Sequence, residues 1–309
     1  MSTDAGAGAG TGRWLGWAQV DVFAEQAYQG NMLAIFTDAT GLSTQQMQSL
    51  ARETNLSETT FILPAPADEE REHGVRVRIF TVDEELPFAG HPTLGTASWL
   101  WANHAVLRGA QQVRLRLNVG TIEVQFRAPT PAEPGVYGEM RQRDAEFGAR
   151  PHAAAIAAAC GLDVTDLHAK LPPQVVSTGL PFCIVPLASL DALRRLRVNP
   201  DLLQAALGDT GAKLLSAITP AADAGVWRVR MPFNGSDDPA TGSAAGCAIS
   251  YLVMQGAVAS GAPITIDQGS EVNRPSRLYV RASYCDNAVT NVFVAGRTIP
   301  VASGRFLLA

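Results

Sequence analysis

The chain has 309 residues, a formal net charge of -5 and 47% hydrophobic residues, which suits one large or two medium globular domains. Its 24 lysines and arginines are scattered, which argues against a nucleic-acid partner, and no run of about 20 apolar residues predicts a membrane span. The segment from Met1 to Arg13 is rich in glycine and alanine and lacks the charged start and apolar block of a secretory signal. We therefore predict a flexible tail over residues 1–13.

Cysteine and histidine spacing bears on compartment and cofactor. The four cysteines are far apart and form no Cys-x-x-Cys pair, which is typical of reduced thiols in a cytoplasmic protein. The five histidines show no metal-ligand spacing. We expect a cytoplasmic protein with no metal and no cofactor.

The first half of the chain predicts mixed strands and helices. Strands are expected over residues 17–23, 32–36, 59–63 and 75–81, with a hairpin over 113–117 and 121–126. Ser43 and Gln46 have the spacing of a capping box and predict a helix that ends near Glu53. A second helix, from about Pro92 to Val106, is apolar on nearly every face, so we expect it to be buried inside a curled sheet. The proline-rich residues 128–134 predict an interdomain linker.

The second half repeats this layout. Short helices are predicted over residues 153–160, 190–196 and 200–207, and a long one over about 239–254. Strands are predicted over residues 175–177, 182–185, 226–231, 264–267, 276–281 and 289–295. The long helix carries many small residues, which implies close packing against the strands around it.

Two stretches of the chain, residues 91–97 and 238–244, are variants of one phrase. Each reads polar residue, proline, two residues, glycine, hydroxyl residue, alanine, and Pro239 follows Pro92 by 147 positions. Glycines in other pairs of similar runs recur 149 positions apart. This pattern predicts an internal duplication of the chain into two domains. Proline just inside its start predicts that each phrase opens a helix. Two helix starts with unpaired N–H groups are suited to bind one small anion between them.

Several phrases, in order, resemble the PhzF-like family of phenazine-biosynthesis isomerases over about residues 14–300. They are Asp21-Val22-Phe23, Gly30-Asn31, Asn55 to Thr59, Glu85 to Ala97, Asp238 to Ala244, Gln268-Gly269 and Arg274-Pro275-Ser276. The resemblance implies an α+β fold like that of diaminopimelate epimerase, with two similar halves, each a β-barrel-like sheet wrapped around a central buried helix. It implies domains over residues 14–128 and 135–297, with a C-terminal return to the first domain at about 298–309.

Glu58, His91 and Asp238 are the catalytic residues that the resemblance implies. From the residues alone, Glu58 reads as an exposed loop carboxylate, and His91 and Asp238 read as helix caps. In the family, the proton-transferring glutamate stands at the place of Glu58, and His91 and Asp238 would orient the substrate and relay protons. A carboxylate walled by apolar groups has a raised pKa and can take and return a proton near neutral pH.

Gly90, Gly242 and Ser243 are the substrate-binding residues that we expect. The main-chain N–H groups of Gly242 and Ser243, with the Ser243 hydroxyl, are suited to hold a substrate carboxylate, and Gly90 is a further candidate for the same role from the first helix. The alternative for both glycines is turn geometry or close packing.

The resemblance implies a cofactor-independent isomerase of the trans-2,3-dihydro-3-hydroxyanthranilate isomerase type, in secondary metabolism. It would move a proton and a double bond on a small unsaturated cyclic carboxylic acid, and a homodimer is plausible. One alternative is a non-catalytic PhzF-like binding protein. Another is an amino-acid epimerase with two opposed thiols, which the lack of cysteine at either helix start disfavours, because Cys183 and Cys247 read as core residues. Met32 and Val82 replace prolines common in the family, so the substrate stays open.

Overall fold

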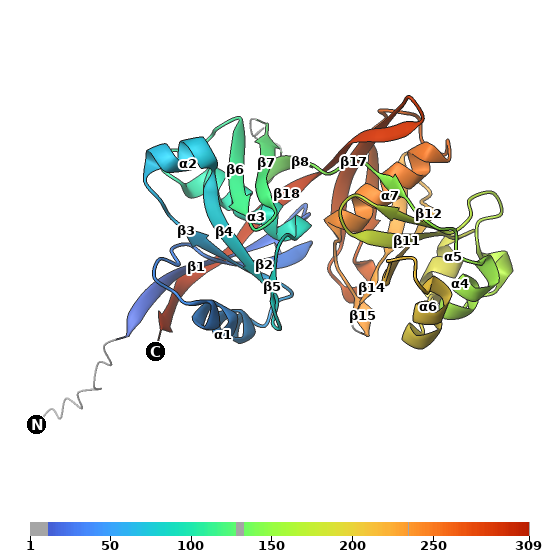
Figure 1. Cartoon of the computed structure of the whole chain (residues 1–309), viewed down its shortest axis with the longest axis horizontal. Helices are drawn as coiled ribbons and strands as arrows, with labels where there is room; N and C mark the ends of the chain where they lie inside the picture. The colour runs from blue at the N-terminus through green and yellow to red at the C-terminus, as the bar shows by residue number, and fades with distance from the viewer. Residues whose placement is uncertain (1–11, 128–132, 234, 309) are drawn as a thin grey trace, which may run out of the picture.

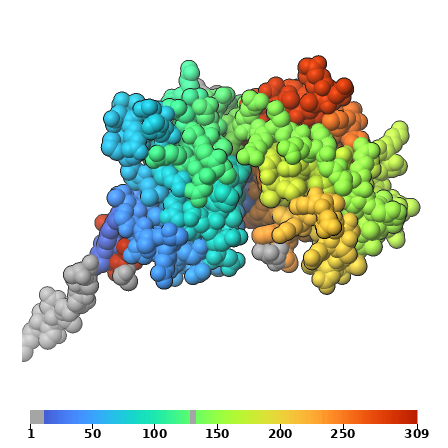
Figure 2. Space-filling view, in the orientation of Figure 1, coloured from blue at the N-terminus to red at the C-terminus, as the bar shows by residue number. Residues whose placement is uncertain are grey.

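The computed structural model describes residues 12–127, 133–233 and 235–308, which form two lobes side by side (Figures 1 and 2). The first lobe, blue to green, and the second, yellow to orange, are each a curled sheet around one helix. The predicted α+β class with two similar halves is confirmed. The predicted tail residues 1–11 and linker residues 128–132 lie outside the described ranges.

The first lobe is a closed barrel of eight strands, because β1 pairs with β18 at the end of the strand order. Its strands, in barrel order, are β1 (Arg13–Val22), β2 (Asn31–Phe36), β3 (Thr59–Leu63), β4 (Val75–Phe80), β6 (Gln112–Leu117), β7 (Gly120–Phe126), β8 (Val136–Arg141) and β18 (Ala288–Leu308). The short β5 (Glu85–Leu86) pairs with β4. Helix α3 (Gly90–Asn103) lies inside, with every residue from His91 to Ser98 buried, so the prediction of a helix buried all round is confirmed.

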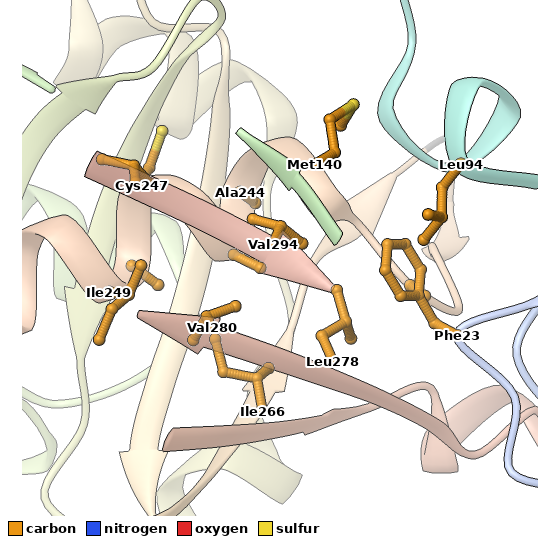
Figure 3. Close-up of a cluster of buried hydrophobic side chains, with 14 of the residues drawn as sticks. Phe23, Leu94, Met140, Ala244, Cys247, Ile249, Ile266, Leu278, Val280 and Val294 are labelled. Carbon is orange, nitrogen blue, oxygen red and sulfur yellow. The ribbon is translucent and has the colours of Figure 1, made fainter. Parts of the chain in front are cut away.

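The second lobe wraps its sheet around α7 (Gly242–Met254). From β18 the strands follow as β17 (Ser276–Cys285), β16 (Ile264–Gln268), β13 (Val226–Arg230), β12 (Leu214–Pro220), β11 (Pro181–Pro186), β10 (Gln174–Ser177) and β9 (Glu146–Phe147). Ahead of β9, the Gln142 and Ala145 N–H groups donate to β18 carbonyls, which brings the sheet back on itself. Figure 3 shows small and aliphatic side chains of α7, among them Ala244 and Ile249, beside Leu278 and Val280 of β17 and Val294 of β18.

Helices on the outside give each lobe a second layer. These are α1 (Thr44–Thr54), α2 (Ala67–His73), α4 (Ala153–Ala159), α5 (Leu190–Arg195) and α6 (Pro200–Leu207), with 3-10 turns at Val164–Asp166 and Ser270–Val272. The capping box of Ser43 and Gln46 at the start of α1 is confirmed. Strand β11 is buried on both faces, since Phe182 belongs to the core around α7 and Cys183 to the core under α4 to α6.

The two lobes share strands and a buried ion pair. β18 pairs with β17 through Ala295 and with β1 from Thr298 onward, and β8 pairs with both β7 and β18. Arg274 of the second lobe donates to the carboxylate of Asp21, which is 1% exposed, at 2.6 Å. The domain boundaries expected from the sequence stay a prediction, and in the structure β8 is a strand of the first barrel.

One of the two predicted helix starts is wrong in position. α3 begins at Gly90, so Pro92 lies in its first turn as predicted, but α7 begins at Gly242, three residues after Pro239. Gly242 therefore occupies the place of Gly90, and the repeated phrase is out of register with the structural repeat. The physical reason lies in tertiary contacts of the preceding turn: the Asp238 N–H donates to the Met231 carbonyl, and Gln268 donates to the Asp238 carbonyl at 2.7 Å. Residues bound in this way cannot start the helix.

Elements absent from the sequence prediction are β8, β12 and α2, the two-residue strands β5, β9, β14 (Pro232–Phe233) and β15 (Ser236–Asp237), and the two 3-10 turns. β12 is buried on both faces from Leu215 to Thr219, so it lacks the alternation of polar and apolar residues that signals a strand.

Candidate active site

The starts of α3 and α7 face each other between the two lobes. A Cβ atom added to Gly90 would lie 3.6 Å from the main-chain nitrogen of Ser243 and 3.7 Å from the Cα atom of Gly242. The N-cap residues, Ala89 and Thr241, make no side-chain hydrogen bond to their helix. The free N–H groups and the positive dipole ends of both helices are therefore directed at one small space, which favours an anion there.

Glu58 reaches this space from the loop between α1 and β3. Asn55 ends α1 in the left-handed conformation (φ 51°), and the chain turns so that Glu58 directly precedes β3. Its Oε2 atom lies 3.4 Å from Nε2 of His91, with the side chains 18% and 7% exposed. Both atoms are buried, and within the described part of the chain neither makes a hydrogen bond. Such groups are rare in folded proteins, and active sites are among the places where they occur.

Burial governs the protonation of this pair. It raises the pKa of the Glu58 carboxyl, and a hydrogen bond from Ser57 lowers that pKa by less. It lowers the pKa of His91 to about 4, although the charge of Asp238 and a hydrogen bond to the Met32 main chain act in the opposite direction. His91 is therefore a neutral imidazole at pH 7, and Glu58 exchanges its proton closer to neutrality than an ordinary glutamate.

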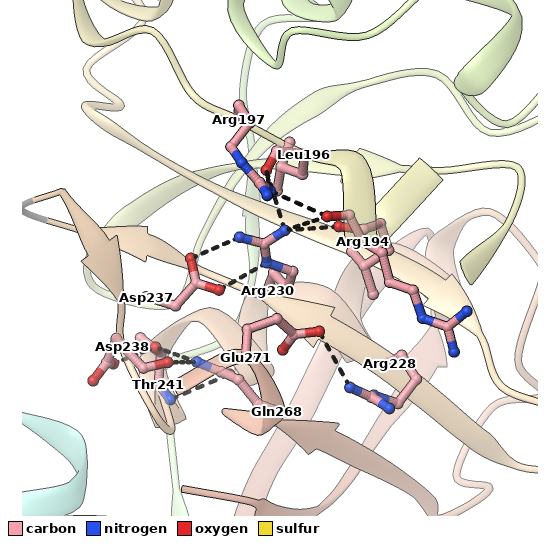
Figure 4. Close-up of polar contacts among 11 residues, drawn as sticks. Arg194, Leu196, Arg197, Arg228, Arg230, Asp237, Asp238, Thr241, Gln268 and Glu271 are labelled. Carbon is pink, nitrogen blue, oxygen red and sulfur yellow. Dashed lines mark hydrogen bonds and ion pairs between the residues drawn. The ribbon is translucent and has the colours of Figure 1, made fainter. Parts of the chain in front are cut away.

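Asp238 stands at the same space from the second lobe and is fully hydrogen-bonded. Its Oδ1 accepts from the Asn31 amide at 2.8 Å, and its Oδ2 accepts from the Thr241 hydroxyl. Gln268 donates to Thr241 Oγ1 at 3.0 Å and so completes the group (Figure 4). The pKa of Asp238 is raised to about 6, mainly by burial and to a smaller extent by the charge of Glu58, whereas the Thr241 hydrogen bond, the His91 ring and the Asn31 hydrogen bond act in the opposite direction.

Ser243, Gly242 and Gly90 form the opposed helix starts. Ser243 is half-buried at the second position of α7, where its N–H is one of the free donors of the helix start. A Cβ atom on Gly242 would lie 3.2 Å from Cζ of Phe23, so close packing favours a glycine there. Neither Gly90 nor Gly242 has a positive φ, so turn geometry does not explain them.

The structure brings all six predicted site residues to this one region, and it adds others. Asn31, Thr241 and Gln268 hold Asp238 in place and were not singled out as site residues. The signal for all three was in the sequence, because Gly30-Asn31, Asp238 to Ala244 and Gln268-Gly269 are phrases of the family resemblance. Met32 contributes the main-chain group that binds the His91 ring, whereas the carbonyl of Val82 accepts from Arg52 of α1.

The four cysteines lie away from the helix starts. Cys160, Cys183 and Cys247 are buried, and burial raises the pKa of Cys183 to about 12 and that of Cys247 to about 11. Cys247 sits five residues into α7, beside the Thr178 hydroxyl. Thiols with such raised pKa values are poor acid–base groups at neutral pH, and this geometry gives no support to a pair of opposed thiols.

We also searched the described residues for surface hollows, metal-binding clusters and membrane-spanning helices. Surface hollows of about 970 and 1000 Å³ lie elsewhere, one beside Trp101 and Phe126 and one beside Arg230 and Asp237. Over the described ranges, no group of three or more His, Cys, Asp or Glu side chains is arranged to hold a metal ion. Nor does any helix there have the length and apolar character needed to cross a lipid bilayer.

Fold and site together define a class of enzyme: two barrel-like halves, each around a buried helix, with a carboxylate of raised pKa between the helix starts. The family of phenazine biosynthesis-like proteins matches residues 20–304, and this chain belongs to it. A trans-2,3-dihydro-3-hydroxyanthranilate isomerase of Pseudomonas aeruginosa is 36% identical, over 94% of this chain and 98% of that one. The chain is an isomerase of the PhzF-like kind.

Solved structures agree with this assignment. The structure of a predicted epimerase from Pseudomonas aeruginosa is similar with a TM-score of 0.79 and 38% identity, covering 96% of this chain and all of the other. A PhzF-family phenazine biosynthesis protein from Bacillus anthracis has a TM-score of 0.84 at 24% identity, with the same coverage. The second likeness concerns the fold alone.

Proposed function

We propose that the chain moves a proton within a small unsaturated cyclic carboxylic acid, of the trans-2,3-dihydro-3-hydroxyanthranilate type. The observation that carries the proposal is the buried Glu58–His91 pair, whose facing atoms make no hydrogen bond to any residue that the structure describes and lie beside two helix starts without a side-chain cap. Relatives 33–36% identical to this chain are named isomerases of that compound, which supports the substrate class.

Substrate binding would use the helix starts. The substrate carboxylate would accept hydrogen bonds from the N–H groups of Gly242 and Ser243 and from the Ser243 hydroxyl, with Gly90 on the opposite side. The positive dipole ends of α3 and α7 favour an anion there, and they would stabilise the charge that spreads onto the carboxylate during reaction.

Proton transfer would then run through Glu58. The ionised Glu58 takes a proton from a ring carbon whose C–H bond is acidified by conjugation, and the electron pair moves through the conjugated system. The protonated Glu58 returns the proton at another carbon, so that one double bond has shifted and atoms and charge balance. Neutral His91 and the hydrogen-bonded Asp238 would orient the amino or hydroxyl groups and relay protons. One carboxylate on one side of the space favours removal and return on one face of the ring.

Location and assembly are further parts of the proposal. The four cysteines are unpaired, which supports a reducing compartment such as the cytoplasm. A homodimer is proposed from the family resemblance, and sedimentation velocity of the purified chain would test it.

Proton NMR in D2O with trans-2,3-dihydro-3-hydroxyanthranilate tests the function. We expect conversion with deuterium in the product, and a loss of rate of about 10²–10⁴-fold in Glu58→Gln, the range of positioned acid–base catalysis. Glu53→Gln, an exposed glutamate on α1, is the matched control and should leave the rate unchanged. Turnover at the wild-type rate by Glu58→Gln would reject the assigned role. No conversion by the wild type would reject this substrate.

A further inference from the structure

Behind Asp238 lies a second buried ion pair that the proposed mechanism does not use. Arg230 at the end of β13 donates to both oxygens of Asp237, at 2.7 Å from Nε and 3.3 Å from Nη2. The side chains are 10% and 6% exposed. The remaining guanidinium nitrogen, Nη1, donates to the carbonyls of Leu193, Arg194 and Leu196 at 2.9–3.3 Å. Arg230 thus also caps the C-terminal end of α5, where a cation is favoured.

The Arg230–Asp237 pair is close to Asp238 in the sequence. Arg230 precedes a hairpin of β14 (Pro232–Phe233) and β15 (Ser236–Asp237), Asp237 is the last residue of that hairpin, and Asp238 follows it. The Asp238 N–H donates to the carbonyl of Met231, which follows Arg230. Consecutive side chains of an extended segment point to opposite sides. Figure 4 shows this arrangement, with Asp237 turned toward Arg230 and Asp238 turned toward Thr241.

We propose that Arg230 and Asp237 are positioning residues for Asp238, which fix its orientation and balance the charge beside it. The inference depends on the proposed function in one respect, which is the catalytic role of Asp238. Arg230 anchors one side of the extended strand end to α5, while Asn31 and Thr241 hold the Asp238 carboxylate on the other. As long as the pair is intact, the Asp237 charge next to Asp238 is neutralised.

Several titratable or charged groups surround Asp238. Glu58 and His91 face it from the first lobe, and Asp237 and Arg230 lie behind it. Arg228 and Glu271 form a further pair, 3.5 Å apart, on β13 and the adjacent 3-10 turn. Removing Arg230 leaves an unbalanced negative charge next to Asp238, which raises its pKa. Neutralising Asp237 leaves an unbalanced positive charge, which lowers it.

The test is a carbon NMR titration of the Asp238 carboxyl in protein labelled at aspartate Cγ, with Asp238→Asn to assign the signal. We expect Arg230→Gln to raise the pKa of Asp238 and Asp237→Asn to lower it, each by roughly 1.5 units, as for a charge about 8 Å away at an effective dielectric constant of about 20. The double variant, Arg230→Gln with Asp237→Asn, restores a neutral hydrogen-bonded pair and should return the pKa toward the wild-type value. Arg228→Gln is the matched control on the same strand and should change it least.

A purely structural role predicts a different pattern. Both single variants would then lower stability without opposite shifts of the Asp238 pKa, and that result would overturn the inference. Steady-state kinetics add a second criterion: opposite displacement of the acid limb of the kcat profile in the two single variants supports it. Full activity of Asp238→Asn would reject the catalytic role of Asp238 and leave the titration result to decide the positioning role alone.

Discussion

The N-termini of α3 and α7 meet in the same space but bring different chemistry to it. Both helices are buried, start at a glycine and lack a side-chain cap. The start of α3 lies beside Glu58 and His91, whose facing atoms are buried without hydrogen bonds among the described residues. The start of α7 follows Asp238, both of whose oxygens accept hydrogen bonds.

This difference indicates a division of labour between two halves of similar architecture. A carboxylate oxygen that makes no hydrogen bond among the described residues, such as Oε2 of Glu58, is available to exchange a proton with a substrate. A carboxylate held by two donors is suited to orient other groups. The backbone of the two halves could therefore stay alike while their side chains took on separate roles.

The largest expected effect compares the two carboxylates directly. Glu58→Gln should cost about 10²–10⁴-fold in kcat, as above. Asp238→Asn should cost less, about tenfold to a hundredfold, because its amide cannot accept from both Asn31 and Thr241 and forfeits one charge-assisted hydrogen bond of about 1.5–3 kcal/mol. Deuterium incorporation rates measure both. Equal losses would contradict the division of labour.

Smaller effects are expected from alanine substitutions at the two helix starts, and these effects should differ in kind. Gly242→Ala should destabilise the fold by about 1–3 kcal/mol, because its methyl group would press on Phe23, which is itself packed against Gly296. Gly90→Ala places a methyl group 3.6 Å from the Ser243 nitrogen, in the proposed anion space. We expect it to raise KM with little change in stability. Urea denaturation and steady-state kinetics on both variants test this, and equal loss of stability would contradict it.

The dependence of stability on pH distinguishes Glu58 from His91. The folded state favours the protonated form of Glu58, so wild type loses stability as the pH rises from the ordinary range of a glutamate through the raised pKa. Glu58→Gln should therefore be more stable than wild type at pH 8, with a gap that shrinks toward pH 4. Thermal melts over this range provide the measurement, and a gap that grows on acidification would refute the assignment.

The pKa shift of His91 has the opposite effect on the pH dependence of stability. Its pKa falls from 6.5 to about 4 on folding, so its contribution to stability is lost as the pH falls through this range. His91→Gln should have a shallower decline between pH 6.5 and 4 than wild type. Nitrogen NMR of the wild-type ring should find it neutral at pH 5.5, and a charged ring at that pH would contradict the prediction.

The smallest effect is expected from Cys247. It is buried against Thr178 and the Leu180 carbonyl, away from the space between the helix starts. Cys247→Ala should leave the reaction rate unchanged and lower stability by about 1 kcal/mol or less, the loss of one small buried atom. A loss of activity on the scale of Glu58→Gln would revive chemistry based on thiols.

Much of the architecture could be predicted from the sequence, because the signals are local. The capping box of α1, the apolar faces of α3 and α7 and the boundaries of β3, α5 and α6 depend on residues a few positions apart. The phrases around Glu58, His91 and Asp238 also sufficed to name six residues that the fold brings to one place. Their residue types can be read directly from the sequence, and in the proposed function each side chain has its own chemical role.

Tertiary structure alone decided where α7 begins, how the Asp238 carboxylate is held and which buried polar atoms of the described residues lack a hydrogen-bond partner. α7 starts after Pro239 because Met231 and Gln268 bind the preceding residue, and these contacts join segments that lie 7 and 30 positions away from Asp238. The Asn31 amide meets Asp238 across 207 positions. Desolvation, which sets the protonation of Glu58 and His91, arises only when both lobes enclose them, so no pattern of neighbouring residues can reveal it.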